Sequence, residues 1–155
     1  MTEQTAPAQK KRRFAGTPAQ IRSAAKVYKV LAYATGVMLL LVVVEMVAKY
    51  AYGAEIVLGG TTADGAANTF GFLPADSFEG GFNLSTAVLI VHGWMYVAYL
   101  IADFRLWSLM RWPFTRFVTI ALGGVVPALS FIMEAKVHKE VERELATHPE
   151  AAKRY

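Results

Sequence analysis

The stretch that decides the fold is VLAYATGVMLLLVVVEMVAKY, residues 30–50. From Val30 to Val47 it runs for 18 residues with a single charged side chain, Glu45. A helix of about 20 apolar residues can cross the hydrocarbon core of a bilayer, which is roughly 30 Å thick. The stretch therefore predicts a membrane-spanning helix over about 27–50.

This first span is expected to remain in the protein as an anchor. Glu45 and Lys49 lie where a cleaved signal peptide has an uncharged end with small residues. Two further apolar runs predict two more spans, over about 84–104 and 114–134. The basic connection between them carries tryptophans, which favour the membrane–water interface.

Composition supports a membrane protein and excludes several chemistries. The 155 residues allow one small bundle, and 55% of them are hydrophobic. No cysteine is present, which excludes disulfides, thiolate metal sites, iron–sulfur clusters and covalently attached haem. The formal charge is +4, but the basic residues flank the apolar runs. That placement indicates a topology signal rather than a nucleic-acid surface.

We therefore predict an all-α fold, a transmembrane bundle of three helices over 24–136. A basic N-terminal arm, 1–23, is expected to be disordered. The segment 51–83 holds seven of the 12 glycines and predicts a long outer loop, with short ordered pieces around NTFGFLP. A charged tail, 137–155, is expected to continue the third helix into solvent as far as Pro149.

The distribution of positive charge predicts the orientation. Seven Lys and Arg precede the first span and three lie in the second connection, which gives ten on one side. Lys49 and five cations of the tail give six on the other. Because positive residues favour the cytoplasm, we expect a multi-pass protein of the cell membrane with a cytoplasmic N-terminus. The loop 51–83 and the C-terminus are expected outside.

A polar stripe marks the second span. His92, Tyr96, Tyr99 and Asp103 follow one another at intervals of four, three and four, so they share one face of a helix. The third predicted span repeats these intervals with another set of small and polar residues. That set is Gly123, Pro127, Ser130 and Glu134.

Depth along the predicted helices brings three ionisable groups together. Glu45, His92 and Glu134 are expected in the outer half of the bilayer, whereas Asp103 and Arg105 are expected at the cytoplasmic rim. The candidate network inside the membrane comprises Glu45, His92, Tyr96, Tyr99, Ser130 and Glu134. Gly93, Gly123, Gly124 and Pro127 are expected to allow close helix packing and a kink.

Two interpretations of this network remain open. Ionisable groups inside a membrane are costly, so they suggest a proton-handling or ligand-binding site. Alternatively, the groups bond to one another and hold the helices together, because polar contacts supply part of the association energy in lipid. The second interpretation is the simpler one and is favoured. A single intramembrane histidine cannot supply two axial haem ligands, and no metal-ligand spacing stands out.

Four segments together resemble a known family. They are EMVAKYAYG, VHGWMYVAYL, RWPFTRFVTIALGG and VPALSFIMEAKV. The chain resembles an actinobacterial family of small three-helix integral membrane proteins with a domain of unknown function. The most specific positions are His92, Gly93, Trp94, Tyr99, Trp112, Pro113, Pro127 and Glu134. The resemblance implies the topology and adds no reaction.

The functional expectation is a non-enzymatic protein without a cofactor, a metal or a catalytic site. It would act as an assembly or accessory partner of a larger membrane complex, by analogy with the small accessory subunits of actinobacterial respiratory complexes. Its partners would be the lipid bilayer and other membrane proteins or further copies of itself, and no nucleic acid. The alternative is a small oligomeric proton-coupled transporter or channel that uses the Glu45, His92 and Glu134 cluster.

Overall fold

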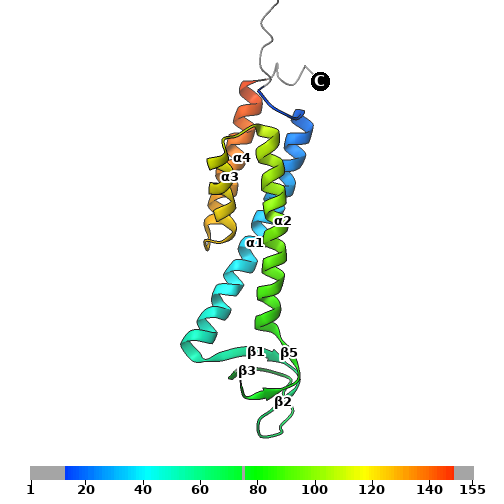
Figure 1. Cartoon of the computed structure of the whole chain (residues 1–155), viewed down its shortest axis with the longest axis vertical. Coiled ribbons are helices and arrows are strands. Elements are labelled where there is room, and N and C mark those ends of the chain that lie inside the picture. Colours follow the sequence, from blue (N-terminus) through cyan, green and yellow to red (C-terminus); the bar gives the residue numbers. More distant parts are fainter. Residues whose placement is uncertain (1–12, 75, 149–155) are drawn as a thin grey trace, which may run out of the picture.

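The computed structural model describes residues 13–74 and 76–148, and it is mainly helical (Figure 1). Its α-helices are α1 (Pro18–Tyr52), α2 (Leu84–Met110), α3 (Phe114–Ala121) and α4 (Leu129–Thr147), and the 3₁₀ helix η1 (Leu122–Gly124) follows α3. The two long helices, α1 and α2, run antiparallel along an elongated molecule. We call the end that carries the strands the sheet end. The opposite end, where α1 begins and α4 finishes, is the terminal end.

Helix α1 begins earlier than the hydropathy predicts. Thr17 and Gln20 form a capping box, and Pro18 occupies the first turn, where its missing N–H costs nothing. Just upstream, Phe14 is buried and the N–H of Ala15 donates to the carbonyl of Leu109 at 2.8 Å. The prediction of a disordered arm is therefore wrong for residues 13–23. Its remaining part, 1–12, lies outside the described residues.

The segment between α1 and α2 contains five short strands, so the all-α prediction is corrected. The strands are β1 (Ala54–Leu58), β2 (Thr61–Thr62), β3 (Phe70–Pro74), β4 (Phe78–Glu79) and β5 (Phe82–Asn83). One antiparallel sheet has the order β3-β1-β5, and β2 pairs with β4. The strand β3 is the FGFLP of the ordered piece expected in this region. This sheet lies across the ends of α1 and α2, where the chain passes from one helix to the other.

The third predicted span is a helical hairpin. The apolar segment Phe114–Gly124 runs beside α2 for 11 residues, roughly 16 Å, which is about half the length needed to cross a bilayer. The chain then turns at Pro127 and Ala128, and α4 runs back to the terminal end (Figure 1). Ala128 adopts a left-handed backbone with φ +64°. The prediction of one continuous helix over 114–134 is therefore wrong. Pro127 accompanies a complete reversal of the chain rather than a kink.

The core lies at the terminal end, where α1, α2 and α4 meet. Met133, Val137, Val141 and Leu145 form a buried stripe along α4 at intervals of four. Ion pairs join the same helix to residues before and within α1, with Arg13 at 2.8 Å from Glu144 and Arg22 at 3.5 Å from Glu142. The tail is thus helical through Thr147, but it packs against α1 instead of extending into solvent. Consequently, the N-terminal part and the C-terminal part lie at the same end, which contradicts their predicted placement on opposite sides.

Candidate functional site

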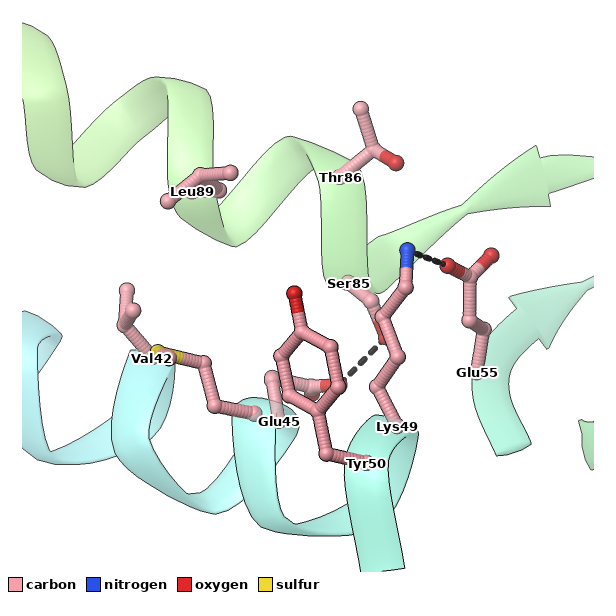
Figure 2. A pocket seen from close by; sticks show the side chains of 9 residues that line it. Val42, Glu45, Lys49, Tyr50, Glu55, Ser85, Thr86 and Leu89 are labelled. Atoms are coloured by element: carbon pink, nitrogen blue, oxygen red, sulfur yellow. Dashed lines mark hydrogen bonds and ion pairs between the residues drawn. The ribbon is translucent and has the colours of Figure 1, made fainter. Parts of the chain in front are cut away.

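A cleft of about 320 Å³ opens between α1 and α2 at the sheet end, and we call it the sheet-end cleft (Figure 2). Aliphatic and thioether side chains form one part of its wall, and charged or hydroxyl groups form the part next to the strands. The lining residues are Val42, Glu45, Met46, Lys49, Tyr50, Glu55, Ser85, Thr86 and Leu89. The cleft is therefore amphipathic.

The polar groups of the sheet-end cleft are paired with one another. Lys49 donates to one oxygen of the buried Glu55 at 2.6 Å, and Asn83 donates to the other at 2.5 Å. The hydroxyl of Ser85 donates to Glu45. The Lys49 ammonium, and next the Asn83 amide, lower the pKa of Glu55 below its ordinary value of 4.5. These contacts fasten α1 to β1 and to the beginning of α2.

A second group of polar side chains is buried where α1, α2 and α4 meet, and we call it the junction cluster. Its members are Tyr28, Tyr99, Asp103, Ser130 and Glu134, all at most 3% exposed. The rings of Tyr28 and Tyr99 lie 5.6 Å apart. Asp103 follows Tyr99 by four residues and therefore lies on the same face of α2. A Cβ atom at Gly123 would lie 3.1 Å from the Tyr99 hydroxyl and 3.3 Å from Cα of Ser130.

Tyrosines of α2 hold the hairpin in place. The hydroxyl of Tyr99 donates to the carbonyl of Ile120 at 2.6 Å, and that of Tyr96 donates to the carbonyl of Ala121 at 3.3 Å. Carbonyl groups near the end of a helix lack helical partners. The two tyrosines satisfy such groups where α3 gives way to η1.

Several atoms of the junction cluster have no hydrogen-bond partner within the described part of the chain. They are the hydroxyl oxygens of Tyr28 and Ser130, both carboxylate oxygens of Asp103, and Oε1 of Glu134. The last atom lies 3.6 Å from the Nζ of Lys29, which is an ion pair too long for a hydrogen bond. Unpaired buried polar atoms are rare and costly, so the junction cluster is a second candidate site.

The structure does not bring Glu45, His92 and Glu134 together. Glu45 contacts Ser85 at the sheet end, and His92 lies seven residues further along α2, about 10 Å away. Glu134 pairs with Lys29, which precedes Glu45 by 16 residues of α1, about 24 Å. The predicted cluster fails because α4 returns to the terminal end, where it carries Glu134 away from Glu45.

The structure also shows where the other residues of the predicted site lie. Asp103 is fully buried and faces the tyrosines, whereas Arg105 is exposed, so the two do not form a pair at the rim. Gly124 lies against the ring of Tyr96, where a Cβ atom would come within 2.5 Å. Gly93 is exposed on α2, and a Cβ atom at this position would meet no other atom within 4 Å.

Sequence reasoning missed Tyr28 and Lys29 as site residues because it placed them at the edge of the first span. The pattern of α1 contained a signal for the first of them. Tyr28, Ala32, Thr35 and Leu39 recur at intervals of four, three and four and are all buried. This pattern marks the inner face of a helix. It includes a tyrosine and a threonine, much as the corresponding stripe of α2 includes polar side chains.

These features define a class: a small, mainly helical chain with two long apolar helices, a helical hairpin and a buried polar junction. The chain belongs to the family described as a domain of unknown function (DUF3817), which matches residues 25–139. The resemblance to an actinobacterial family without an assigned function is thereby confirmed.

Mycobacterial relatives accompany the family match. Uncharacterised proteins of Mycobacterium tuberculosis and Mycobacterium bovis are each 25% identical over 123 residues, which is 79% of this chain and 80% of the relative. An uncharacterised protein of Mycobacterium leprae is 40% identical over 53 residues, 34% of this chain and 44% of the relative. No solved structure matches the chain significantly.

Proposed function

We propose that this protein is an integral membrane protein that acts as an accessory or assembly partner of another membrane protein. Both long helices are long and apolar enough to cross a membrane. Only 28% of the apolar window of α1 and 6% of that of α2 is buried inside the protein. A water-soluble protein would bury such helices in its core. The exposed apolar surfaces of α1 and α2 are therefore suited to contact lipid and a helix of a partner protein.

The charge distribution supports an orientation with the terminal end in the cytoplasm. Of the 11 Lys and Arg within the described residues, ten lie on the half of the molecule that contains the terminal end, and only Lys49 lies near the strands. The positive-inside tendency favours this arrangement. The return of α4 makes the asymmetry stronger than the sequence count suggests. In this orientation the strands face outward and α4 ends on the cytoplasmic side.

The observation that carries the partner role is an exposed glycine–tryptophan pair on α2. A glycine inside a helix costs about 1 kcal/mol relative to alanine, and Gly93 gains no internal packing in return. Trp94 is 73% exposed and lies about 15 Å from the beginning of α2, away from the interface positions that tryptophan favours. Glycine lets a second helix approach closely, and tryptophan supplies a large contact area.

The proposed occupant of this surface is a transmembrane helix of a different protein. The transporter alternative relied on Glu45, His92 and Glu134 in one cluster, which the return of α4 separates. We therefore base the proposal on the exterior of α2 and not on that cluster.

Photo-crosslinking in native membranes tests the proposal. A photo-reactive phenylalanine analogue at position 94 should give one discrete heavier product containing a second protein. The same analogue at Val44, an exposed position of α1, is the matched control and should give only lipid adducts. The additional substitution Gly93→Leu should abolish the product at position 94. Lipid adducts alone at position 94 would refute the partner role, and a product of two copies of this chain would replace it with self-association.

A further inference from the structure

The sheet-end cleft carries one negative charge that no cation of the described residues compensates. Lys49 and Glu55 neutralise each other in an ion pair of 2.6 Å. The carboxylate of Glu45 accepts a hydrogen bond from Ser85 on one oxygen, and no ion pair within the described part of the chain includes it. A carboxylate beside apolar side chains is stabilised by a cation and by hydrogen-bond donors. An occupant that brings a positively charged donor therefore suits the Glu45 side of the cleft.

The Lys49 ammonium provides a binding group of the opposite sign. An ammonium has three N–H donors, and the recorded hydrogen bond to Glu55 uses one of them. The side chain is 51% exposed, so the other donors can reach an anionic group in the cleft. Glu45 and Lys49 are four residues apart on α1, which places their Cβ atoms about 5–6 Å from each other on one face. The two side chains are thus spaced to bind the two ends of a small zwitterion.

The apolar part of the cleft lies further from the strands than the polar part (Figure 2). Val42 precedes Lys49 by seven residues of α1, about 10 Å. Met46 and Leu89 complete this apolar wall from the two facing helices. In the proposed orientation the cleft therefore runs from a charged mouth at the outer surface to an apolar end inside the bilayer. A lipid of the outer leaflet has its headgroup and its acyl chains in the same order.

We propose that the sheet-end cleft binds an aminophospholipid, with the lipid ammonium on Glu45 and the lipid phosphate on Lys49. The first part of an acyl chain lies against the apolar wall. The volume of about 320 Å³ is at the lower end of the range for small-molecule sites. The cleft accordingly holds the headgroup and the beginning of a chain, while the rest of the lipid stays in the bilayer. This inference rests on the proposed membrane placement of the protein.

The two charged contacts specify the headgroup. Phosphatidylethanolamine has a primary ammonium that donates hydrogen bonds to a carboxylate. Phosphatidylcholine has a cation without an N–H donor, and phosphatidylglycerol has no cation. Hydrogen bonds to a charged group are about twice as strong as those between neutral groups. Phosphatidylethanolamine is therefore the lipid that satisfies both Glu45 and Lys49.

Native mass spectrometry of the full-length protein tests the headgroup. The protein is released from micelles that contain equal amounts of these three phospholipids with identical acyl chains. One molecule of phosphatidylethanolamine should be retained on the order of tenfold more often than either other lipid. Equal retention of the three lipids, or a preference for phosphatidylglycerol, would overturn the proposal.

A conservative variant tests the ammonium contact. Glu45→Gln keeps an oxygen that can accept from Ser85 but removes the charge, so the preference for phosphatidylethanolamine over phosphatidylcholine should fall about tenfold. The matched control is Glu79→Gln, which removes an exposed carboxylate of β4 outside the cleft and should keep the preference of the parent. An unchanged preference in the Glu45→Gln variant would overturn the contact.

Two neighbouring residues of α2 test the location. Leu89 and Ile90 are 58% and 56% exposed, and of the two only Leu89 lines the cleft. Leu89→Trp should fill the cleft and abolish selective retention of phosphatidylethanolamine, whereas Ile90→Trp should retain it. Both side chains lie on the surface, so neither substitution disturbs the core. The same result for both variants would overturn the assignment of the lipid to this cleft.

Alkaline extraction of native membranes separates failure of the lipid site from failure of the proposed function. A chain that stays in the membrane and forms the crosslink at position 94, but shows no lipid preference, would overturn the lipid site alone. A chain that alkaline carbonate releases into solution would overturn the proposed function and the lipid site together.

Discussion

Glu55 is a single buried carboxylate that holds three elements together. Its two oxygens accept hydrogen bonds from Lys49 near the end of α1 and from Asn83, the N-cap of α2, and its backbone lies in β1. The pair with the half-exposed Lys49 alone is worth little. Two hydrogen bonds to one buried charged group contribute more. Glu55 therefore stabilises the joint between the helices and the sheet.

The lowered pKa of Glu55 predicts how its contribution depends on pH. The ionised form is favoured in the folded state by Lys49 and then Asn83. Its stabilisation is thus fully present above the ordinary pKa of 4.5 and is lost as the pH falls through the lower folded-state pKa. Glu55→Gln should reduce the free energy of unfolding by about 1–3 kcal/mol at neutral pH.

Chemical denaturation in detergent over a pH series measures this effect. The difference between the parent and Glu55→Gln should be constant above pH 4.5 and shrink below it. Glu79→Gln, in the exposed part of β4, provides the control and should follow the parent throughout. A difference that grew on acidification would contradict the assigned role.

At the scale of single residues, the sequence predicts which side chains share a helix face better than it predicts the groups that those side chains contact. The intervals between Tyr96, Tyr99 and Asp103 correctly place them on one face of α2. The groups that the tyrosines contact are backbone carbonyls of Ile120 and Ala121. Those carbonyls are available only because the helix ends there, and their availability depends on the path of a later segment.

The turn between η1 and α4 is the element that most changes the predicted architecture. A non-glycine residue in the left-handed region costs roughly 1–2 kcal/mol, and Ala128 adopts φ +64° there. Glycine has no such cost. Ala128→Gly should therefore increase the free energy of unfolding by up to about 1 kcal/mol.

A matched substitution within a regular helix gives the opposite sign. Ala135 is exposed in α4, so Ala135→Gly should decrease the free energy of unfolding by about 1 kcal/mol. Thermal or chemical unfolding of both variants in the same detergent provides the comparison. If Ala128→Gly also destabilised the protein, a continuous third helix would be favoured over the hairpin.

The helical hairpin could be predicted from the sequence only in part. Hydropathy identifies the apolar run over 117–133 but does not distinguish a span from a segment that enters and returns. The decisive signal lies further along, where Met133, Val137, Val141 and Leu145 recur at intervals of four among charged residues. An apolar stripe on a charged helix must be buried against protein. This requirement is incompatible with a tail that extends freely into water.

At the scale of the whole molecule, α4 finishes at the end where α1 begins, and in the proposed topology this end is cytoplasmic. The chain has no cysteine, so single cysteines can be introduced without altering a native thiol. In the proposed topology, Ala19→Cys and Thr147→Cys should react with a membrane-impermeant maleimide only in inverted vesicles. Asp64→Cys should react in intact cells.

These three positions are exposed in the structure, so burial does not explain a lack of labelling. Solubilised samples, in which all three should react, serve as the control. Labelling of position 147 in intact cells would instead support the three-span topology predicted from hydropathy.

The return of α4 also has a consequence for biosynthesis. A chain emerges from the ribosome N-terminus first, so in the proposed topology α1 and α2 enter the membrane before α4 has been translated. During that interval Tyr28 and Tyr99 lack the cover that the apolar stripe of α4 later provides. Truncation before α4 would therefore leave a protein in which the polar side chains between α1 and α2 are uncovered. We expect such a truncated product to be degraded faster than the full-length protein.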